Sequence, residues 1–157
     1  MVPALTLLHG QGFEGPNDEY RKAREHYRQG RYKECLNECL KAFESTIKTI
    51  CTKRGWVYDP GRDTASALIT ICVTNGLVPA FMQSCLTTIP TVRNKMGGHG
   101  QGPEPVEVPY FAEYLLHETI VFWWMHIGGC RRSRLWRAEL DTGLRLRLNV
   151  GCVPVCE

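Results

Sequence analysis

The sequence has no CxxC pair, no apolar run long enough to cross a membrane, and no basic residue ahead of its apolar amino-terminal stretch. A spanning helix needs about 18 or more apolar residues, and a signal peptide begins with a positively charged segment. The eight cysteines are too sparse in 157 residues for a small disulfide scaffold. We therefore expect a cytoplasmic protein that does not engage a membrane, with buried thiols and without a metal or cofactor site.

Regular alternation of apolar and polar residues is also missing, which argues against a core built of strands. Apolar residues instead recur at helical spacing, most regularly at Leu36, Leu40, Phe43, Ile47 and Ile50. With the start and stop signals, this spacing predicts an all-α bundle of about five helices. They are expected from Asn17–Asp18 to Gly30, from about Arg31 to Lys53, from a cap at Asp63 or Thr64 to Thr74, over Leu77–Ile89 up to an interruption at Pro90, and from about Tyr110 to Met125.

Charge is distributed unevenly along the chain. Residues 1–127 carry 13 Lys and Arg against 13 Asp and Glu, whereas residues 128–157 carry six Arg, no Lys and three acids, which is the whole net charge of +3. A neutral body excludes nucleic-acid binding driven by overall basicity, so any RNA groove must rely on local charge. Composition suggests a leader over 1–12, a helical domain over 13–127 and an Arg-rich tail over 128–157. The tail is either a basic arm for nucleic acid or an extension unrelated to the fold.

One segment, PTVRNKMGGHGQGP, combines residue types that suit phosphate chemistry. Arg93, Asn94, Lys95 and His99 lie within seven residues on a glycine-rich, loop-like stretch. A guanidinium holds two phosphate oxygens at once, and an imidazole exchanges a proton near neutral pH. The 2′-hydroxyl of RNA is an internal nucleophile, so no metal is required to supply one. Taken alone the pattern is common, because glycine-rich loops are more often connectors.

Arg93, Asn94 and His99 match the R-x(4–6)-H signature of the HEPN superfamily, including the polar residue after the arginine. The neighbouring sequence segments are more specific than this signature. GRYKECLNECLKAFESTIKTICTKRGW, DTASALI, NGLVP and PTVRNKMGGHGQG resemble the bacterial abortive-infection C-terminal domain family, which includes AbiJ-like proteins, from about Phe13 to Met125. The resemblance implies a HEPN-like bundle that forms a homodimer. It also implies a toxin or effector of antiviral defence that cleaves RNA without metal and leaves a 2′,3′-cyclic phosphate.

The resemblance also implies a role for each site residue, in a cleft shared by two subunits. His99 would be the general acid and base, Arg93 would stabilise charge on the phosphorus oxygens, and Asn94 would orient the phosphate or His99. Glu44 and Lys48, four residues apart in AFESTIK, are candidates to line the same cleft and bind substrate. At that spacing they would also serve as a plain helix-stabilising pair.

Other functions stay open at this stage. The second hypothesis is a non-catalytic HEPN module. Such a module binds a partner protein, such as a cognate antitoxin nucleotidyltransferase, or binds RNA without cutting it. A plainer alternative is a helical dimerisation domain whose glycine loop only connects helices. Two Arg93–His99 pairs facing one open cleft would favour the nuclease. Lys95 lies outside the family signature and either touches backbone phosphate or is solvated.

Overall fold

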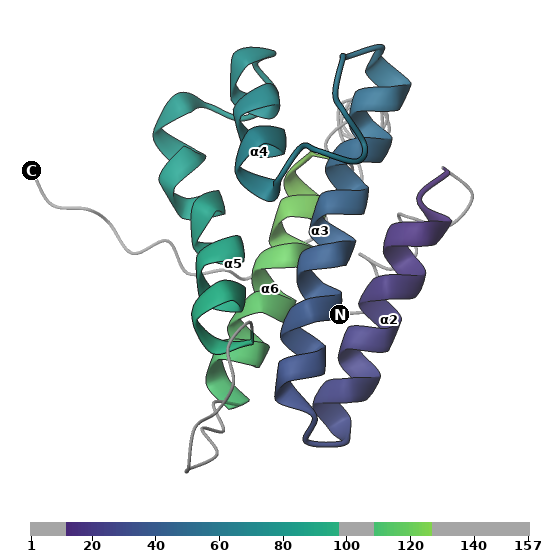
Figure 1. Cartoon of the computed structure of the whole chain (residues 1–157), viewed down its shortest axis with the longest axis vertical. Helices are drawn as coiled ribbons and strands as arrows, with labels where there is room; N and C mark the ends of the chain where they lie inside the picture. The colour runs from purple at the N-terminus through teal and green to yellow at the C-terminus, as the bar shows by residue number, and fades with distance from the viewer. Residues whose placement is uncertain (1–11, 98–108, 127–157) are drawn as a thin grey trace, which may run out of the picture.

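The structure, a computed structural model, describes residues 12–97 and 109–126 (Figure 1). These two ranges contain helices and no strand, which confirms the all-α prediction for this part of the chain. Residues 1–11 of the predicted leader, the Arg-rich tail and His99 lie outside the described residues. The elements are α2 (Glu14–Arg28), α3 (Tyr32–Arg54), α4 (Ala65–Thr74), the 3-10 helix η1 (Ala80–Met82), α5 (Gln83–Met96) and α6 (Pro109–His126).

Helix α3 is the central element and packs against α2, α4, α5 and α6. In Figure 1, α2 lies on one side of α3, and α4 and α5 lie on the other. The predicted apolar face of α3 forms much of the core, because Leu36, Phe43, Ile47 and Ile50 are buried. Leu40 is the exception on that face, since it is only partly buried.

A hydrogen-bonded pair of side chains lies inside this core. The Trp123 indole N–H of α6 donates to the Thr46 hydroxyl of α3 at 2.6 Å, and that hydroxyl donates in turn to the Ala42 carbonyl at 2.6 Å. Both Trp123 and Thr46 are fully enclosed. Buried polar groups need such partners, because an indole N–H without an acceptor loses its bonds to water on folding.

Four cysteines, Cys35, Cys39, Cys51 and Cys72, belong to the same core as free thiols. Burial raises the pKa of Cys72 to about 12, so this thiol stays protonated at neutral pH. The pKa of Cys39 is also raised, first by its hydrogen bond with Cys35 and then by burial. These side chains therefore act as small hydrophobic groups, as expected from the sequence.

Two predicted helix ends are confirmed, and one helix begins earlier than predicted. Gly55 ends α3 in the left-handed conformation, at φ 69°, which glycine adopts without steric cost. The Thr64 side chain accepts from the Ala67 N–H and caps α4. Helix α2 begins at Glu14, ahead of the predicted start, because Pro16 is compatible with the first turn of a helix and is buried there.

The prediction that Pro90 interrupts the fourth helix is wrong. Pro90 lies inside α5, which begins at Gln83 and continues to Met96, so Arg93, Asn94 and Lys95 are helical and not on a loop. A proline inside a helix removes one backbone hydrogen bond and costs about 3 kcal/mol. Here Leu86, Ile89 and Pro90 are all buried, and we attribute the continuity of α5 to this apolar packing. No helix in the described ranges is long and apolar enough to cross a membrane.

Candidate functional site

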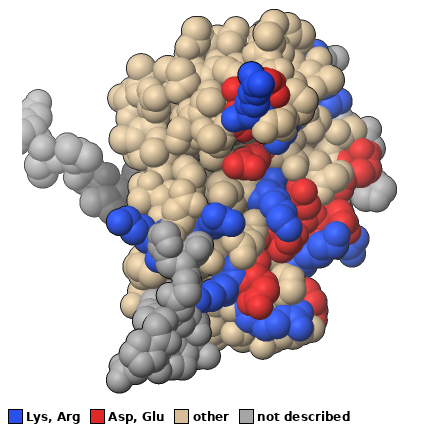
Figure 2. Space-filling model, viewed as in Figure 1, with Lys and Arg blue, Asp and Glu red and all other residues tan. Residues whose placement is uncertain are grey.

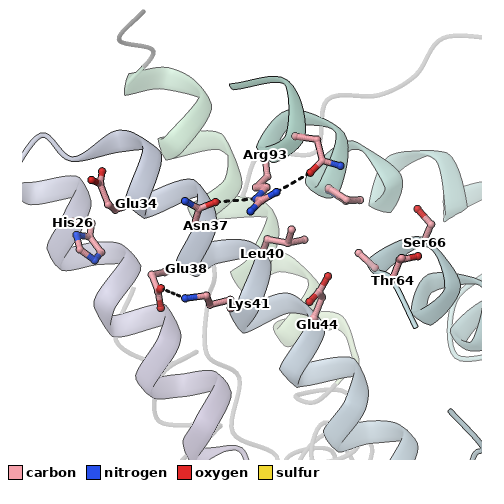
Figure 3. A pocket seen from close by; sticks show the side chains of 13 residues that line it. His26, Glu34, Asn37, Glu38, Leu40, Lys41, Glu44, Thr64, Ser66 and Arg93 are labelled. Carbon is pink, nitrogen blue, oxygen red and sulfur yellow. Dashed lines mark hydrogen bonds and ion pairs between the residues drawn. The ribbon is translucent and has the colours of Figure 1, made fainter. Parts of the chain in front are cut away.

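A groove of about 620 Å³ lies between the polar side of α3 and the facing ends of α4 and α5 (Figure 3). Arg93 and Asn94 reach it from the last turns of α5, and Glu44 reaches it from the middle of α3. The groove therefore collects three of the residues predicted for the site. Its lining consists of His26 from α2, Glu34, Asn37, Glu38, Leu40, Lys41 and Glu44 from α3, Thr64 with Ala65 and Ser66 from the start of α4, and Pro90, Arg93 and Asn94 from α5.

The Arg93 guanidinium is held in place by two side-chain oxygens. Its Nε donates to Oδ1 of Asn37 at 2.8 Å, and its Nη1 donates to Oδ1 of Asn94 at 3.1 Å. Figure 3 shows the Asn37 side chain of α3 pointing toward the Arg93 guanidinium of α5. Both acceptors are neutral amides, so within the described part of the chain Arg93 is oriented without an ion pair and keeps its positive charge for a ligand.

Glu44 lies in the same groove and is about half buried. Burial raises the pKa of its carboxyl, while the positive charges of Lys48 and Arg93 and a hydrogen bond from the Ala65 backbone oppose that rise. The carboxyl thus lies within the electrostatic influence of Arg93. A groove with a fixed guanidinium and a carboxyl of raised pKa can bind an anion and exchange a proton beside it.

The family model for Abi_C, a HEPN-like domain, matches residues 14–123. The chain belongs to this HEPN-like family. The match begins with α2 and extends into α6, so it contains the whole described groove as well as Arg93 and His99. No curated protein and no solved structure shows significant similarity to the chain.

Two of the other residues predicted for the HEPN-like site lie apart from the groove. The Lys48 ammonium donates to the Pro60 carbonyl at 3.3 Å, in the loop between α3 and α4, and Lys48 does not line the groove. Lys95 is exposed in the last turn of α5 and is not part of the groove wall. His99 lies outside the described residues, two positions after Gly97, which follows the end of α5.

Asn37 was missed by reasoning from the sequence, although a signal for it exists. Glu34, Asn37, Lys41 and Glu44 follow one another on α3 at steps of three, four and three. This spacing puts them on one face of the helix, and all four line the groove. The apolar stripe of α3 was recognised, but the polar stripe beside it, which lines the groove, was not.

The groove carries mixed charge. Lys41 pairs with Glu38 at 2.5 Å across one turn of α3. Figure 2 shows basic and acidic side chains intermingled on the face formed by α2 and α3, whereas the surface over α4 has none. The charged or titratable residues of the groove are Glu34, Glu38, Glu44, Lys41, Arg93 and His26.

No cluster of three or more His, Cys, Asp or Glu side chains with metal-binding geometry occurs among the described residues. His26 is engaged within the protein, because its Nδ1 accepts a hydrogen bond from Arg31 Nε at 2.9 Å.

Proposed function

We propose that this HEPN-like protein is a metal-independent endoribonuclease that acts as a toxin or effector in abortive infection. The observation that carries the proposal is the Arg93 guanidinium, which two amide oxygens orient at a groove in a HEPN-like chain. An oriented guanidinium suits a phosphodiester because it binds phosphate oxygens in a fixed geometry and stabilises the charge that develops on them.

The proposed reaction is transesterification within the RNA backbone. The 2′-oxygen forms a bond to phosphorus while the bond from phosphorus to the 5′-oxygen breaks. The proton of the 2′-hydroxyl passes to a base, and the leaving 5′-oxygen takes up a proton. We assign these proton transfers to His99 and charge stabilisation to Arg93. Asn94 orients the phosphate through Arg93, and Glu44 accepts a hydrogen bond from a ribose or base.

We further propose that the active form is a homodimer, with one Arg93–His99 pair from each subunit at a shared cleft. The groove of a single chain does not have the excess of positive charge that a polyanion would need, since it carries three carboxylates against Lys41 and Arg93. A second subunit that places its own Arg93 in the shared cleft would bring two guanidinium groups to the same phosphate.

The test is RNA cleavage by the full chain in EDTA. We expect the parent to cut RNA and leave 2′,3′-cyclic phosphate ends. Arg93→Ala and His99→Ala are each expected to lower the rate by about 100-fold or more, the usual effect of losing a group that stabilises transition-state charge. Lys95→Ala is the matched control for Arg93→Ala. It removes a positive charge from the same helical turn, outside the groove, and should change the rate by less than about twofold.

The nuclease proposal fails if folded parent protein does not cleave, if EDTA abolishes cleavage and a divalent ion restores it, or if both variants cleave like the parent. The second candidate is a binding module for a partner protein such as an antitoxin. Glu34, Glu38 and Glu44 favour it, since an acid-rich groove suits a basic peptide segment better than RNA. A folded protein without cleavage that is neutralised by a co-expressed partner would support this second function.

A further inference from the structure

We propose that Asn37 is a positioning residue that sets which edge of the Arg93 guanidinium meets the ligand. The inference rests on the proposed function, because it concerns how the same groove binds a phosphodiester. Asn37 lies on α3 and Arg93 on α5, 56 positions apart in the chain. Their hydrogen bond therefore joins the two walls of the groove at the point where the ligand would bind.

The hydrogen-bond pattern leaves one edge of the guanidinium available. Nε donates to Asn37 at 2.8 Å and Nη1 makes one bond to Asn94, while Nη2 has no hydrogen-bond partner among the described residues. With Nε occupied, the edge formed by Nε and Nη2 cannot take a phosphate in bidentate fashion. Among the described residues, Nη1 keeps one of its two hydrogens and Nη2 keeps both, and we infer that the terminal edge formed by these two nitrogens carries the ligand.

The backbone at Gly97, just after the end of α5, lies close to both Arg93 and Asn37. A Cβ atom on Gly97 would lie 3.0 Å from the Arg93 carbonyl oxygen, 3.7 Å from Asn37 Oδ1 and 3.7 Å from Leu36 Cβ. The Gly97 N–H also donates to the Arg93 carbonyl at 2.7 Å. The end of α5 thus lies beside Asn37 and Leu36 of α3 at van der Waals distance, and the tight contact of such a Cβ would be with the Arg93 carbonyl of α5 itself.

A neutral acceptor fits this task better than a carboxylate. An arginine side chain loses about 2 kcal/mol of rotamer entropy when it is fixed, and Asn37 imposes part of that ordering before a ligand arrives. An aspartate at the same position would also accept from Nε, but its negative charge would compete with phosphate for Arg93. Asn37 therefore provides orientation without neutralising the guanidinium.

The first experiment follows the Arg93 Nε–H directly by ¹⁵N nuclear magnetic resonance of the full chain, with the signal assigned by its loss in Arg93→Lys. We expect Asn37→Leu and Asn37→Ala to speed exchange of this proton with water by about tenfold, since each loses a hydrogen bond worth roughly 1.4 kcal/mol. Asn37→Asp should preserve the slow exchange. Asn75→Ala is the matched control, because Asn75 also makes a side-chain hydrogen bond, to the Ile71 carbonyl, but outside the groove.

The second experiment measures cleavage kinetics on the same variants. Asn37→Leu should lower kcat by about 10-fold to 100-fold with KM changed less than about threefold, because a misplaced group affects the transition state more than binding. Asn37→Asp should raise KM instead. Circular dichroism and thermal unfolding check that each variant is folded. If Asn37→Leu does not fold, Asn37→Ala takes its place in the kinetic comparison.

The two experiments separate this inference from the nuclease proposal. Unchanged Nε–H exchange in both Asn37→Leu and Asn37→Ala would overturn the positioning role, whether or not the parent cleaves RNA. Faster exchange with unchanged kcat would also overturn it. If the parent does not cleave RNA but exchange is faster in the Asn37 variants than in the parent, the hydrogen bond between Asn37 and Arg93 is supported. The proposed reaction would then be wrong.

Discussion

Helix α3 is joined to two other helices by hydrogen bonds that differ in their surroundings. Thr46 accepts from Trp123 of α6 at 2.6 Å inside the core, and Asn37 accepts from Arg93 of α5 at 2.8 Å at the groove. The core pair is fully enclosed, whereas Arg93 is only partly buried. Similar distances thus occur in an environment without water and in one open to ligands.

The difference lies in what each donor has left to offer. The Trp123 indole has a single N–H, which Thr46 uses completely, so this bond contributes to stability alone. The Arg93 guanidinium keeps N–H groups beyond those that Asn37 and Asn94 occupy, so its bond both orients the group and leaves it able to bind. We infer that breaking the core bond should reduce stability, whereas breaking the groove bond should reduce function.

The largest effect on stability is expected at the core pair. Thr46→Val keeps the shape of the side chain but leaves the Trp123 N–H buried without an acceptor, so it should lower the free energy of unfolding by about 1–3 kcal/mol. Urea denaturation measures this change. The folded variant should retain the parent's cleavage rate and Arg93 Nε–H exchange.

Thr70→Val is the matched control for Thr46→Val. The Thr70 hydroxyl likewise donates to the carbonyl one helical turn earlier, that of Ser66, but Thr70 is exposed. It should change the unfolding free energy by less than about 0.5 kcal/mol. Equal losses in the two valine variants would show that burial of the Trp123 bond contributes nothing, and the contrast between core and groove would fail.

A smaller effect on stability is expected at Gly97, where the groove bond is disturbed from the backbone. Gly97→Ala restricts the unfolded chain, which stabilises by about 0.4–1 kcal/mol. The new Cβ, 3.0 Å from the Arg93 carbonyl oxygen, crowds the last turn of α5 and offsets that gain, because the backbone that carries Arg93 must shift to make room. The net change should stay within about 1 kcal/mol, while Arg93 Nε–H exchange becomes faster.

For Gly97→Ala, nuclear magnetic resonance and urea denaturation are measured on one sample. Gly61→Ala is the control, since a Cβ there meets no atom closer than 3.6 Å. Unchanged Nε–H exchange in Gly97→Ala would show that the close approach at Gly97 does not hold Arg93 against Asn37.

The fold was largely predictable because its signals are local. The apolar stripe of α3, the glycine at position 55 and the threonine cap of α4 each act within a few residues, and all three are confirmed. Pro90 was misjudged because its environment is not local. Its ring is buried within α5, and a sequence does not reveal which distant residues cover a proline.

The site was predictable in part, for a related reason. Arg93 and Asn94 stand out by residue type and by the family signature, and Glu44 stands out because it lies in the family-like segment AFESTIK. All three line the groove. Asn37 lies on the polar stripe of α3, but the stripe alone does not single it out, because its contact with Arg93 depends on where α5 packs against α3. Lys48 lies in the same AFESTIK segment as Glu44, yet its ammonium donates to the Pro60 carbonyl in the loop between α3 and α4.

The smallest effect is expected from Glu44→Gln, and it depends on pH. Burial raises the pKa of Glu44 in the folded chain, so the folded state holds this proton to a higher pH than the unfolded state does. The stability of the parent therefore falls as pH rises from the ordinary carboxyl value, about 4.3, through the raised value. Glutamine removes that loss. The variant should be more stable than the parent at pH 7, by at most about 1 kcal/mol because solvent screens a half-buried group.

Thermal unfolding at pH 7, 5.5 and 4 measures the difference between Glu44→Gln and the parent, which should shrink as the pH falls. Glu34→Gln, on the same stripe but exposed, controls for the loss of a charge. A variant less stable than the parent at pH 7 would mean that attraction to Arg93 and Lys48 outweighs burial. Glu44 would then hold the guanidinium as an ion-pair partner, and the orientation of Arg93 would no longer depend on neutral acceptors alone.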